Sequence, residues 1–198
     1  MSNYDFVTPV IIVLIYLVIY IFRKNIRKKL EKIGTKHKLI KLYVDGFSST
    51  CNIKINSLKK SILIPVLITL IVNIIVYSSL RITNPSFNIL EKTVSTFISP
   101  FSEEIMYRGI LLGFVVVFYF EEFFKIKKWN YPKSLKWSII FAGIMLSSLF
   151  FTQQHQQPAI LQFFSSILYS LLYLYDNRNL TAPITAHLIN NLIANFIL

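Results

Sequence analysis

Charged residues are scarce in this chain. Only 15% of its 198 residues are Asp, Glu, Lys or Arg, whereas 54% are hydrophobic. A soluble domain of this size usually has about 25% charged residues, so the deficit predicts a membrane protein. The formal net charge is +12, but the basic residues are gathered in blocks between apolar runs. Such blocks are typical of the loops of a membrane protein, and we expect no nucleic-acid partner.

Cysteine and glycine are also rare, and each shortage excludes a class of site. Cys51 is the single cysteine, so neither an intrachain disulfide nor a cysteine-based metal cluster can form. Five glycines in the chain argue against a Gly-rich phosphate-binding loop. The sequence also has no sustained strand-like alternation and no apparent repeat, which favours an all-α fold.

What the sequence does have is a series of apolar runs, each long enough to cross a bilayer as a helix of roughly 20 residues. About six spans are expected, at 6–22, 61–80, 93–124, 137–153, 159–175 and 180–198. Basic residues follow the first run instead of preceding it, which favours a retained helix over a cleaved signal peptide. We therefore predict one polytopic membrane helix bundle in contact with lipids.

Two connecting segments hold most of the basic residues. Twelve of the 21 Lys and Arg lie between Arg23 and Lys60, and five more lie between Lys125 and Lys136. Lys and Arg in short loops mark the cytoplasmic side of a membrane protein. Both basic loops are therefore expected in the cytosol, and both termini outside.

Five ionisable side chains remain well inside the apolar runs: Glu103, Glu104, Arg108, His155 and His187. A charge at a helix centre costs about 2.5–3.5 kcal/mol on insertion scales. Such groups face the bundle interior or water, and by default they mark a functional site.

Helix spacing divides the two carboxylates into a paired one and an unpaired one. Glu104 and Arg108 are four residues apart and can form an ion pair, which by itself fits a structural lock between helices equally well. Glu103 is turned about 100° away and has no such partner in its own turn. An unpaired, buried carboxylate suits a general base.

The last apolar run places His187 and Asn191 four residues apart on one helix face. Together they could donate hydrogen bonds to an oxyanion, hold a metal or hold a water, although a lone histidine in a bundle is as often simply hydrogen-bonded. His155 ends the fourth run, and Phe151 one turn earlier could wall a cavity. Taken alone, His155 fits an interfacial histidine among glutamines.

Glu103, His155 and His187 can meet only if the fold brings residues from different depths of the membrane together. By the charge rule, Glu103 and His155 lie towards the outer side, whereas His187 enters from the inside and reaches the middle of the bilayer. A water-filled cavity must therefore extend to the membrane centre. Gly109 and Gly113 form a GxxxG pattern that could permit the close helix approach this requires.

The chain thus carries three motifs in order: EExxxR at 103–108, FxxxH at 151–155 and HxxxN at 187–191. The ordered triple resembles the CAAX prenyl protease and bacteriocin-processing family of intramembrane endopeptidases, also called the CPBP or Abi family. The sequences SPFSEEIMYRGILLG and NLTAPITAHLINNLIANF are similar to its first and last motifs. The resemblance covers roughly residues 95–198, a catalytic core, and leaves residues 1–94 as N-terminal helices and a basic cytosolic loop.

This resemblance implies an enzyme that hydrolyses peptide bonds at or within the membrane. Glu103 would activate the attacking water with the help of His155. Glu104, paired with the arginine of the same motif, would orient the site. His187 and Asn191 would stabilise the oxyanion.

The cofactor stays open between zinc and none. Glu103, His155 and His187 could supply three ligands to zinc, since catalytic zinc sites combine His and carboxylate with one open position. The HExxH signature of many zinc proteases is absent, however. The family has been described both as metal-dependent and as a glutamate-type protease, and we expect water activation without an obligatory metal.

The chain is short, and in this it is similar to small bacterial members of the family linked to bacteriocin or peptide-pheromone genes. That implies a bacterial plasma-membrane protein acting on a small peptide or a membrane protein, in processing or self-immunity. The alternative is a non-catalytic bacteriocin immunity or binding protein. A proton or ion carrier is a third hypothesis, disfavoured because no inverted repeat is apparent. The sequence does not indicate an oligomeric state.

Overall fold

The computed structural model describes residues 49–79, 88–118, 120–122, 131–155 and 159–197, together with 11–18 and the single positions 8, 21, 22, 25 and 46. These residues are helical apart from short connections, and an isolated bridge between Asn52 and Asn179 takes the place of any strand among them. The predicted all-α fold is confirmed for this part of the chain.

The elements follow in the order η2 (Lys59–Leu63), α3 (Ile64–Ser79), α4 (Ile89–Phe97), α5 (Ser99–Glu104), η3 (Ile105–Phe118), α7 (Lys133–Gln153), α8 (Ala159–Tyr175), α9 (Thr181–Leu192) and η4 (Ile193–Ile197), where η marks π-helical segments. Five of the expected runs correspond to these helices. The first expected run, 6–22, coincides with helical residues 11–18 and 21–22, and its other positions except 8 lie outside the described residues.

The third helical run begins earlier than the apolar pattern predicts, at Ile89 within a segment expected to be a polar link. The reason is a capping box. The Asn88 side chain accepts a hydrogen bond from the Glu91 backbone N–H, and the Glu91 carboxylate accepts one from the Asn88 backbone N–H, both at 2.9 Å. Pro100 lies in the first turn of α5, where its missing N–H leaves no hydrogen bond unmade.

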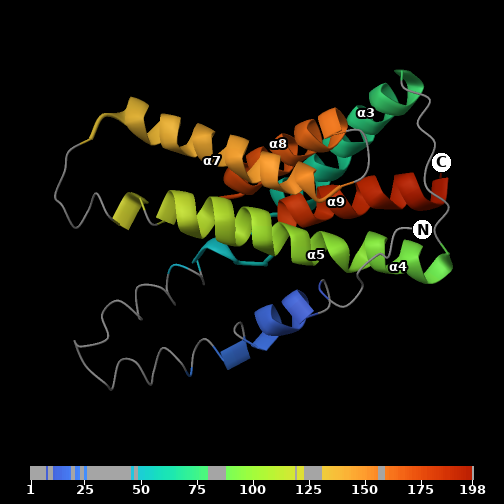
Figure 1. Cartoon of the computed structure of the whole chain (residues 1–198), viewed down its shortest axis with the longest axis horizontal. Helices are drawn as coiled ribbons and strands as arrows, with labels where there is room; N and C mark the ends of the chain where they lie inside the picture. Colours follow the sequence, from blue (N-terminus) through green and yellow to red (C-terminus); the bar gives the residue numbers. More distant parts are fainter. Residues whose placement is uncertain are drawn as a thin grey trace.

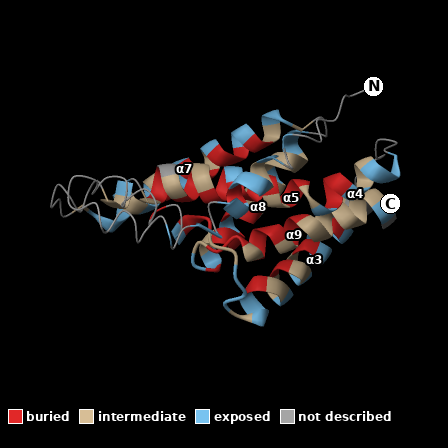
Figure 2. Cartoon of the chain, turned by 90° about the horizontal axis from the view of Figure 1, so that it is seen from below, coloured by how far each residue is buried: buried red, intermediate tan, exposed pale blue. Residues whose placement is uncertain are grey.

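In space, α4, α5 and η3 follow one another along one rod, α7, α8 and α9 pack beside it, and α3 packs against α9 (Figure 1). Helix α7 lies against both η3 and α8, whereas α9 lies against α3, α8 and α5. The buried residues gather where these helices face one another, and exposed residues lie on the outer faces (Figure 2). The end of α5 and the middle of α9 are held side by side in the interior.

Two described helices are long and apolar enough to cross a membrane, Lys59–Val76 and Lys133–Gln153, judged by length and composition. Helix α8 is a shorter apolar helix. The outer face of α3 exposes large aliphatic side chains, among them Leu67, Ile71 and Ile74. A continuous apolar face of this kind is unusual in water and suits contact with lipid.

The two glycines of the GxxxG pattern permit a close approach, of helix α8 at Gly113 and of the segment at Cys51 at Gly109. A Cβ at Gly113 would overlap the Tyr173 hydroxyl of α8, and one at Gly109 would lie 2.7 Å from Cys51 Sγ. The Tyr173 hydroxyl donates a hydrogen bond to the Thr50 carbonyl at 2.8 Å. The absence of side chains at Gly109 and Gly113 thus lets both helix α8 and the non-helical segment that begins at Cys51 pack closely against η3.

This packing gives a stability prediction. We expect Gly113→Ala to lower the free energy of unfolding by about 1–3 kcal/mol, because the added methyl group overlaps the Tyr173 hydroxyl. Thermal unfolding of the detergent-solubilised protein measures the loss. Ala142→Ser, at an exposed position of α7, is the control. Adding Tyr173→Phe should recover part of the loss, and an unchanged melting temperature for Gly113→Ala would contradict the packing.

The connection between α8 and α9 fixes where α9 begins. Asp176 is fully buried and accepts hydrogen bonds from the Ser61 hydroxyl and the Asn179 amide, each at 2.7 Å. Asn179 Oδ1 accepts the Lys54 backbone N–H at 3.2 Å. The residues that precede η2 are thereby fastened to the turn that leads into α9, the helix that carries the histidine of the third motif.

Candidate active site

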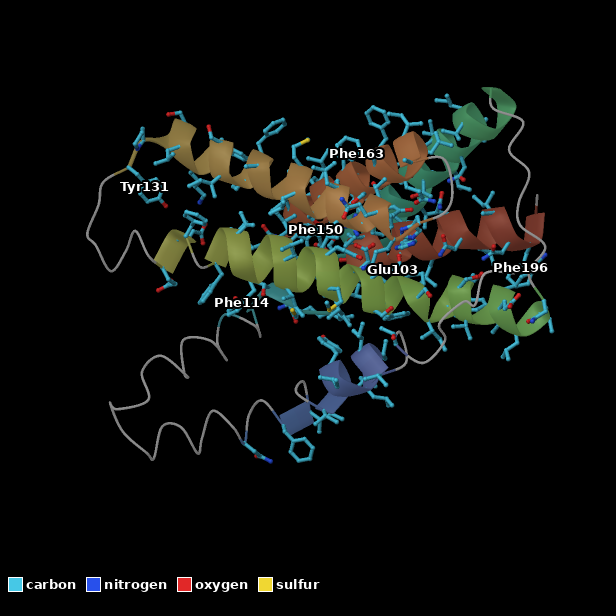
Figure 3. All side chains as sticks on the ribbon, viewed as in Figure 1. Glu103, Phe114, Tyr131, Phe150, Phe163 and Phe196 are labelled. Atoms are coloured by element: carbon cyan, nitrogen blue, oxygen red, sulfur yellow. The ribbon has the colours of Figure 1, made fainter. Side chains whose placement is uncertain are left out.

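The three motif segments meet inside the bundle. Glu103 lies near the end of α5, His155 two residues beyond the end of α7, and His187 in the middle of α9. Glu103 Oε2 is 3.4 Å from His155 Nε2 and 3.7 Å from His187 Nε2. Figure 3 shows Glu103 among a gathering of nitrogen and oxygen atoms between these helices. The convergence that the sequence required is present.

The neighbouring carboxylate has a different environment. Glu104 is fully buried, and its Oε1 accepts hydrogen bonds from Arg108 Nη1 at 3.2 Å and from His187 Nδ1 at 2.8 Å. The predicted ion pair between Glu104 and Arg108 is formed, and it also holds the histidine of the third motif. Glu103, by contrast, keeps 22% of its side chain exposed, and its Oε2 has no hydrogen-bond partner among the described residues.

Arg108 is fully buried and anchored on both sides. Its Nη2 donates to the Ser166 carbonyl at 2.9 Å and to the Ser166 hydroxyl. Its Cζ lies 4.7 Å from the ring centroid of Phe151, 5.4 Å from that of Tyr169 and 5.9 Å from that of Tyr107. Aromatic faces within about 6 Å stabilise a guanidinium that has lost its water. The arginine is thus fixed by α8 as well as by Glu104.

The hydrogen bonds assign the tautomer of each histidine. His155 Nδ1 lies 2.7 Å from the Phe151 carbonyl oxygen, which can only accept, so Nδ1 carries the proton. His187 Nδ1 lies 2.8 Å from the Glu104 carboxylate and is protonated for the same reason. Both Nε2 atoms are therefore turned towards Glu103. Two imidazoles and one carboxylate face a common point.

Phe151, which the sequence led us to expect beside the site, contacts both histidines. Its ring is fully buried, stacks on His155 at a centroid distance of 4.2 Å, and meets His187 edge-on at 5.7 Å. Its backbone carbonyl also orients His155. The FxxxH spacing places both contacts within one helical turn.

Asn191 lies one turn beyond His187, but its amide is engaged elsewhere. Asn191 Nδ2 donates to the Ser95 carbonyl of α4 at 2.8 Å. Asn195 Nδ2 donates to the hydroxyls of Ser95 and Thr96, each at 2.9 Å. The asparagine stripe of α9 and η4 therefore fastens these helices to α4. One of the two amide hydrogens of Asn191 is used in this way.

Sequence reasoning missed the contribution of α8. Ser166 anchors Arg108, and the Tyr169 ring stacks on His187 at a centroid distance of 4.8 Å and an interplanar angle of 20°. The signal in the sequence is a stripe of polar side chains along one face of an otherwise apolar helix. Its members lie at positions i, i+3, i+4 and i+7 and are all buried: Ser166, Tyr169, Ser170 and Tyr173.

The donor set Glu103, His155 and His187 has the ligand types of a zinc site. Within the described residues, however, no group of three His, Cys, Asp or Glu side chains is arranged to hold a metal ion. The remaining thiol is no substitute nucleophile, since burial raises the pKa of Cys51 to about 12. The carboxylates and imidazoles are the groups that the described site offers for acid–base chemistry.

Comparison with known proteins agrees with the motif analysis. A family model described as Type II CAAX prenyl endopeptidase Rce1-like matches residues 85–193 of the chain. No curated protein and no solved structure is significantly similar to it. The matched segment includes Glu103, His155, His187 and Asn191, and therefore all three motifs.

Proposed function

The chain belongs to the type II CAAX prenyl endopeptidase family described as Rce1-like, a family of membrane proteases, and we propose that it is an intramembrane endopeptidase in which Glu103 activates water. The observation that carries the proposal is the approach of two imidazole Nε2 atoms to Glu103 Oε2, at 3.4 and 3.7 Å. Within the described residues this buried Oε2 has no hydrogen-bond partner, so it is an unused proton acceptor beside two imidazoles.

The first step is removal of a proton from water. A water between Glu103 Oε2 and His155 Nε2 can donate one hydrogen bond to each, because both atoms are acceptors in the assigned tautomers. As the oxygen of this water attacks the carbonyl carbon, Glu103 takes its proton. The stack on Phe151 and the bond to its carbonyl keep His155 from turning away.

The second step is stabilisation of the charge that develops on the carbonyl oxygen. His187 Nδ1–H is committed to Glu104, so donation from Nε2 requires the imidazolium form. Asn191 is the second donor in the proposal, through the amide hydrogen that Ser95 does not use. Glu103 then returns its proton to the leaving amide nitrogen as the C–N bond breaks, and water has been added across the peptide bond.

Charge balance is consistent with this assignment of protons. With Glu103 and Glu104 ionised, Arg108 charged and one of the two histidines present as imidazolium, the cluster carries no net charge. Net charge is costly away from water, whereas a neutral, hydrogen-bonded set is tolerated. Neutrality thus calls for one imidazolium, and the proposal places it at His187, whose Nδ1–H donates to the Glu104 carboxylate.

We extend the proposal to topology. Six membrane spans, with a catalytic core at 95–198 and cytosolic basic loops, account for the apolar runs. The ion pairs of Glu121 with Arg178 at 2.7 Å and with Lys136 at 3.1 Å support the scheme. These ion pairs bring the connection after α8 and the start of α7 to the same end of the bundle. A scheme of six spans places both of these segments on the cytosolic side.

The proposed substrate is a small peptide or a membrane protein, cleaved during bacteriocin or peptide processing or for self-immunity in a bacterial plasma membrane. The low content of charged residues supports a substrate presented by the membrane. A prenylated protein is the competing substrate suggested by the name of the family.

A cleavage assay tests the proposal. Purified protein in proteoliposomes is incubated with synthetic 20-residue apolar peptides, some ending in a farnesylated CAAX sequence, and products are identified by mass spectrometry. We expect cleavage of an unmodified peptide at an unchanged rate in excess EDTA or phenanthroline, because Glu103 acts without a metal. Loss of activity with chelator and recovery on adding zinc would contradict the metal-free mechanism, and absence of any cleavage would contradict the enzyme.

A further inference from the structure

Helix α8 contains none of the three motifs, yet it lines the site. We propose that Tyr169 is a positioning residue for the reaction, whose ring fixes the orientation of His187 towards the reacting carbonyl. This inference rests on the proposed protease function. It concerns a residue that acts through His187 and does not touch the substrate.

The argument starts from how His187 is held. His187 is 3% exposed; its ring is attached to the chain through Cγ, and Nδ1 donates a hydrogen bond to Glu104 at 2.8 Å. Cγ and Nδ1 are adjacent ring atoms, so the ring can still tilt about the line through them and swing Nε2 out of line. The near-parallel Tyr169 ring at 4.8 Å covers one face, and Phe151 closes from the side at 5.7 Å. The stack is what restricts the remaining rotation.

Tyr169 also lies beside Arg108, which supports His187 indirectly through a series of hydrogen bonds. Ser166 holds Arg108, Arg108 holds Glu104, and Glu104 holds His187. The Tyr169 ring centroid lies 5.4 Å from Arg108 Cζ and 4.8 Å from the centroid of the His187 ring, so the same ring contacts both side chains. Removing the ring therefore loosens His187 directly and through the arginine.

The expected effect is on turnover and not on binding. The oxyanion forms only in the transition state, so a misdirected Nε2 lowers kcat while KM stays nearly constant. A displacement of about 1 Å in a catalytic group can cost about 10²-fold in rate. We expect Tyr169→Leu to lower kcat by about 10–100-fold, with KM changed by less than about 3-fold.

Two further variants separate positioning from folding. Tyr169→Phe keeps the aromatic face and should retain kcat within about 3-fold of the wild type. Tyr173→Leu is the matched control, one turn along α8, where the tyrosine is also fully buried but its hydroxyl bonds to Thr50 and not to the site. It should lower the melting temperature while leaving kcat per folded molecule within about 3-fold.

The assay uses full-length protein in proteoliposomes and a peptide that the wild type cleaves, with Glu103→Gln measured in parallel. Wild-type kcat in a folded Tyr169→Leu variant, or equal losses in Tyr169→Phe and Tyr169→Leu, would overturn the inference. Should Tyr169→Leu not fold, Tyr169→Met replaces it; failure of both to fold while Tyr173→Leu folds would assign the ring a structural role and also overturn it. Activity in Glu103→Gln would overturn the proposed function instead.

Discussion

Glu103→Gln should lower the rate of peptide cleavage by about 10²–10⁴-fold, the usual contribution of a general base. The side chains are nearly isosteric, so packing against the helices is kept. An amide cannot accept the proton of the attacking water, and it carries no negative charge to balance His187. Single-turnover cleavage of a membrane peptide, followed by mass spectrometry, measures the loss of the chemical step directly.

Glu121→Gln is the matched control for this variant. Glu121 is also a partly exposed carboxylate, but it pairs with Arg178 and Lys136 away from the motif residues. It should cleave within about 3-fold of the wild type. Wild-type cleavage by Glu103→Gln would contradict the general-base role. In cells that the chain protects from a bacteriocin, protection that survives Glu103→Gln would favour sequestration over proteolysis.

Much of the fold could be predicted because a membrane helix is encoded by composition over about 20 residues. The run expected at 159–175 is α8, and that expected at 137–153 lies within α7. The start of α4 was not predicted because its first residues are polar, and a capping box stabilises a helix there in spite of that polarity. Asn88 and Glu91 satisfy the first backbone N–H groups there, so the helix begins before the apolar run does.

The site could be predicted only where its contacts are local. The pair of Glu104 and Arg108 follows from a spacing of four residues within one run of helix. The bond from His187 to Glu104 spans 83 residues, and that from Arg108 to Ser166 spans 58. Such contacts depend on how the helices pack, which no spacing rule contains. The motifs therefore predict which residues form the site, whereas the contacts between individual atoms depend on the packing of the helices.

Asn191 shows the limit of face arguments. Four residues at 100° each leave a drift of about 40° from His187, and α4 packs against this side of α9. The Ser95 carbonyl lies where the asparagine amide can reach it, at 2.8 Å. Asn191 thus lies on the expected face, but one of its amide hydrogens joins α9 to α4, and only the other is available to a substrate.

The largest effect on stability is expected from Arg108→Leu. Arg108 and Glu104 are both fully buried, and the substitution leaves the carboxylate with His187 as its remaining basic partner among the described residues. Removing one partner of a buried ion pair costs about 3–5 kcal/mol, because the other charge stays away from water. Denaturant unfolding of the detergent-solubilised protein should show this loss, together with loss of cleavage.

Two comparisons make this prediction specific to the buried pair. Arg178→Gln breaks the more exposed pair with Glu121 and should cost no more than about 1 kcal/mol. The double variant Glu104→Gln with Arg108→Met should recover most of the stability, since an apolar and a neutral group need no counter-charge. It should remain inactive, because His187 has lost the carboxylate that stabilises its charged form. Recovery of cleavage in the double variant would mean that the pair only locks helices, and that Glu103 works without an oriented imidazolium.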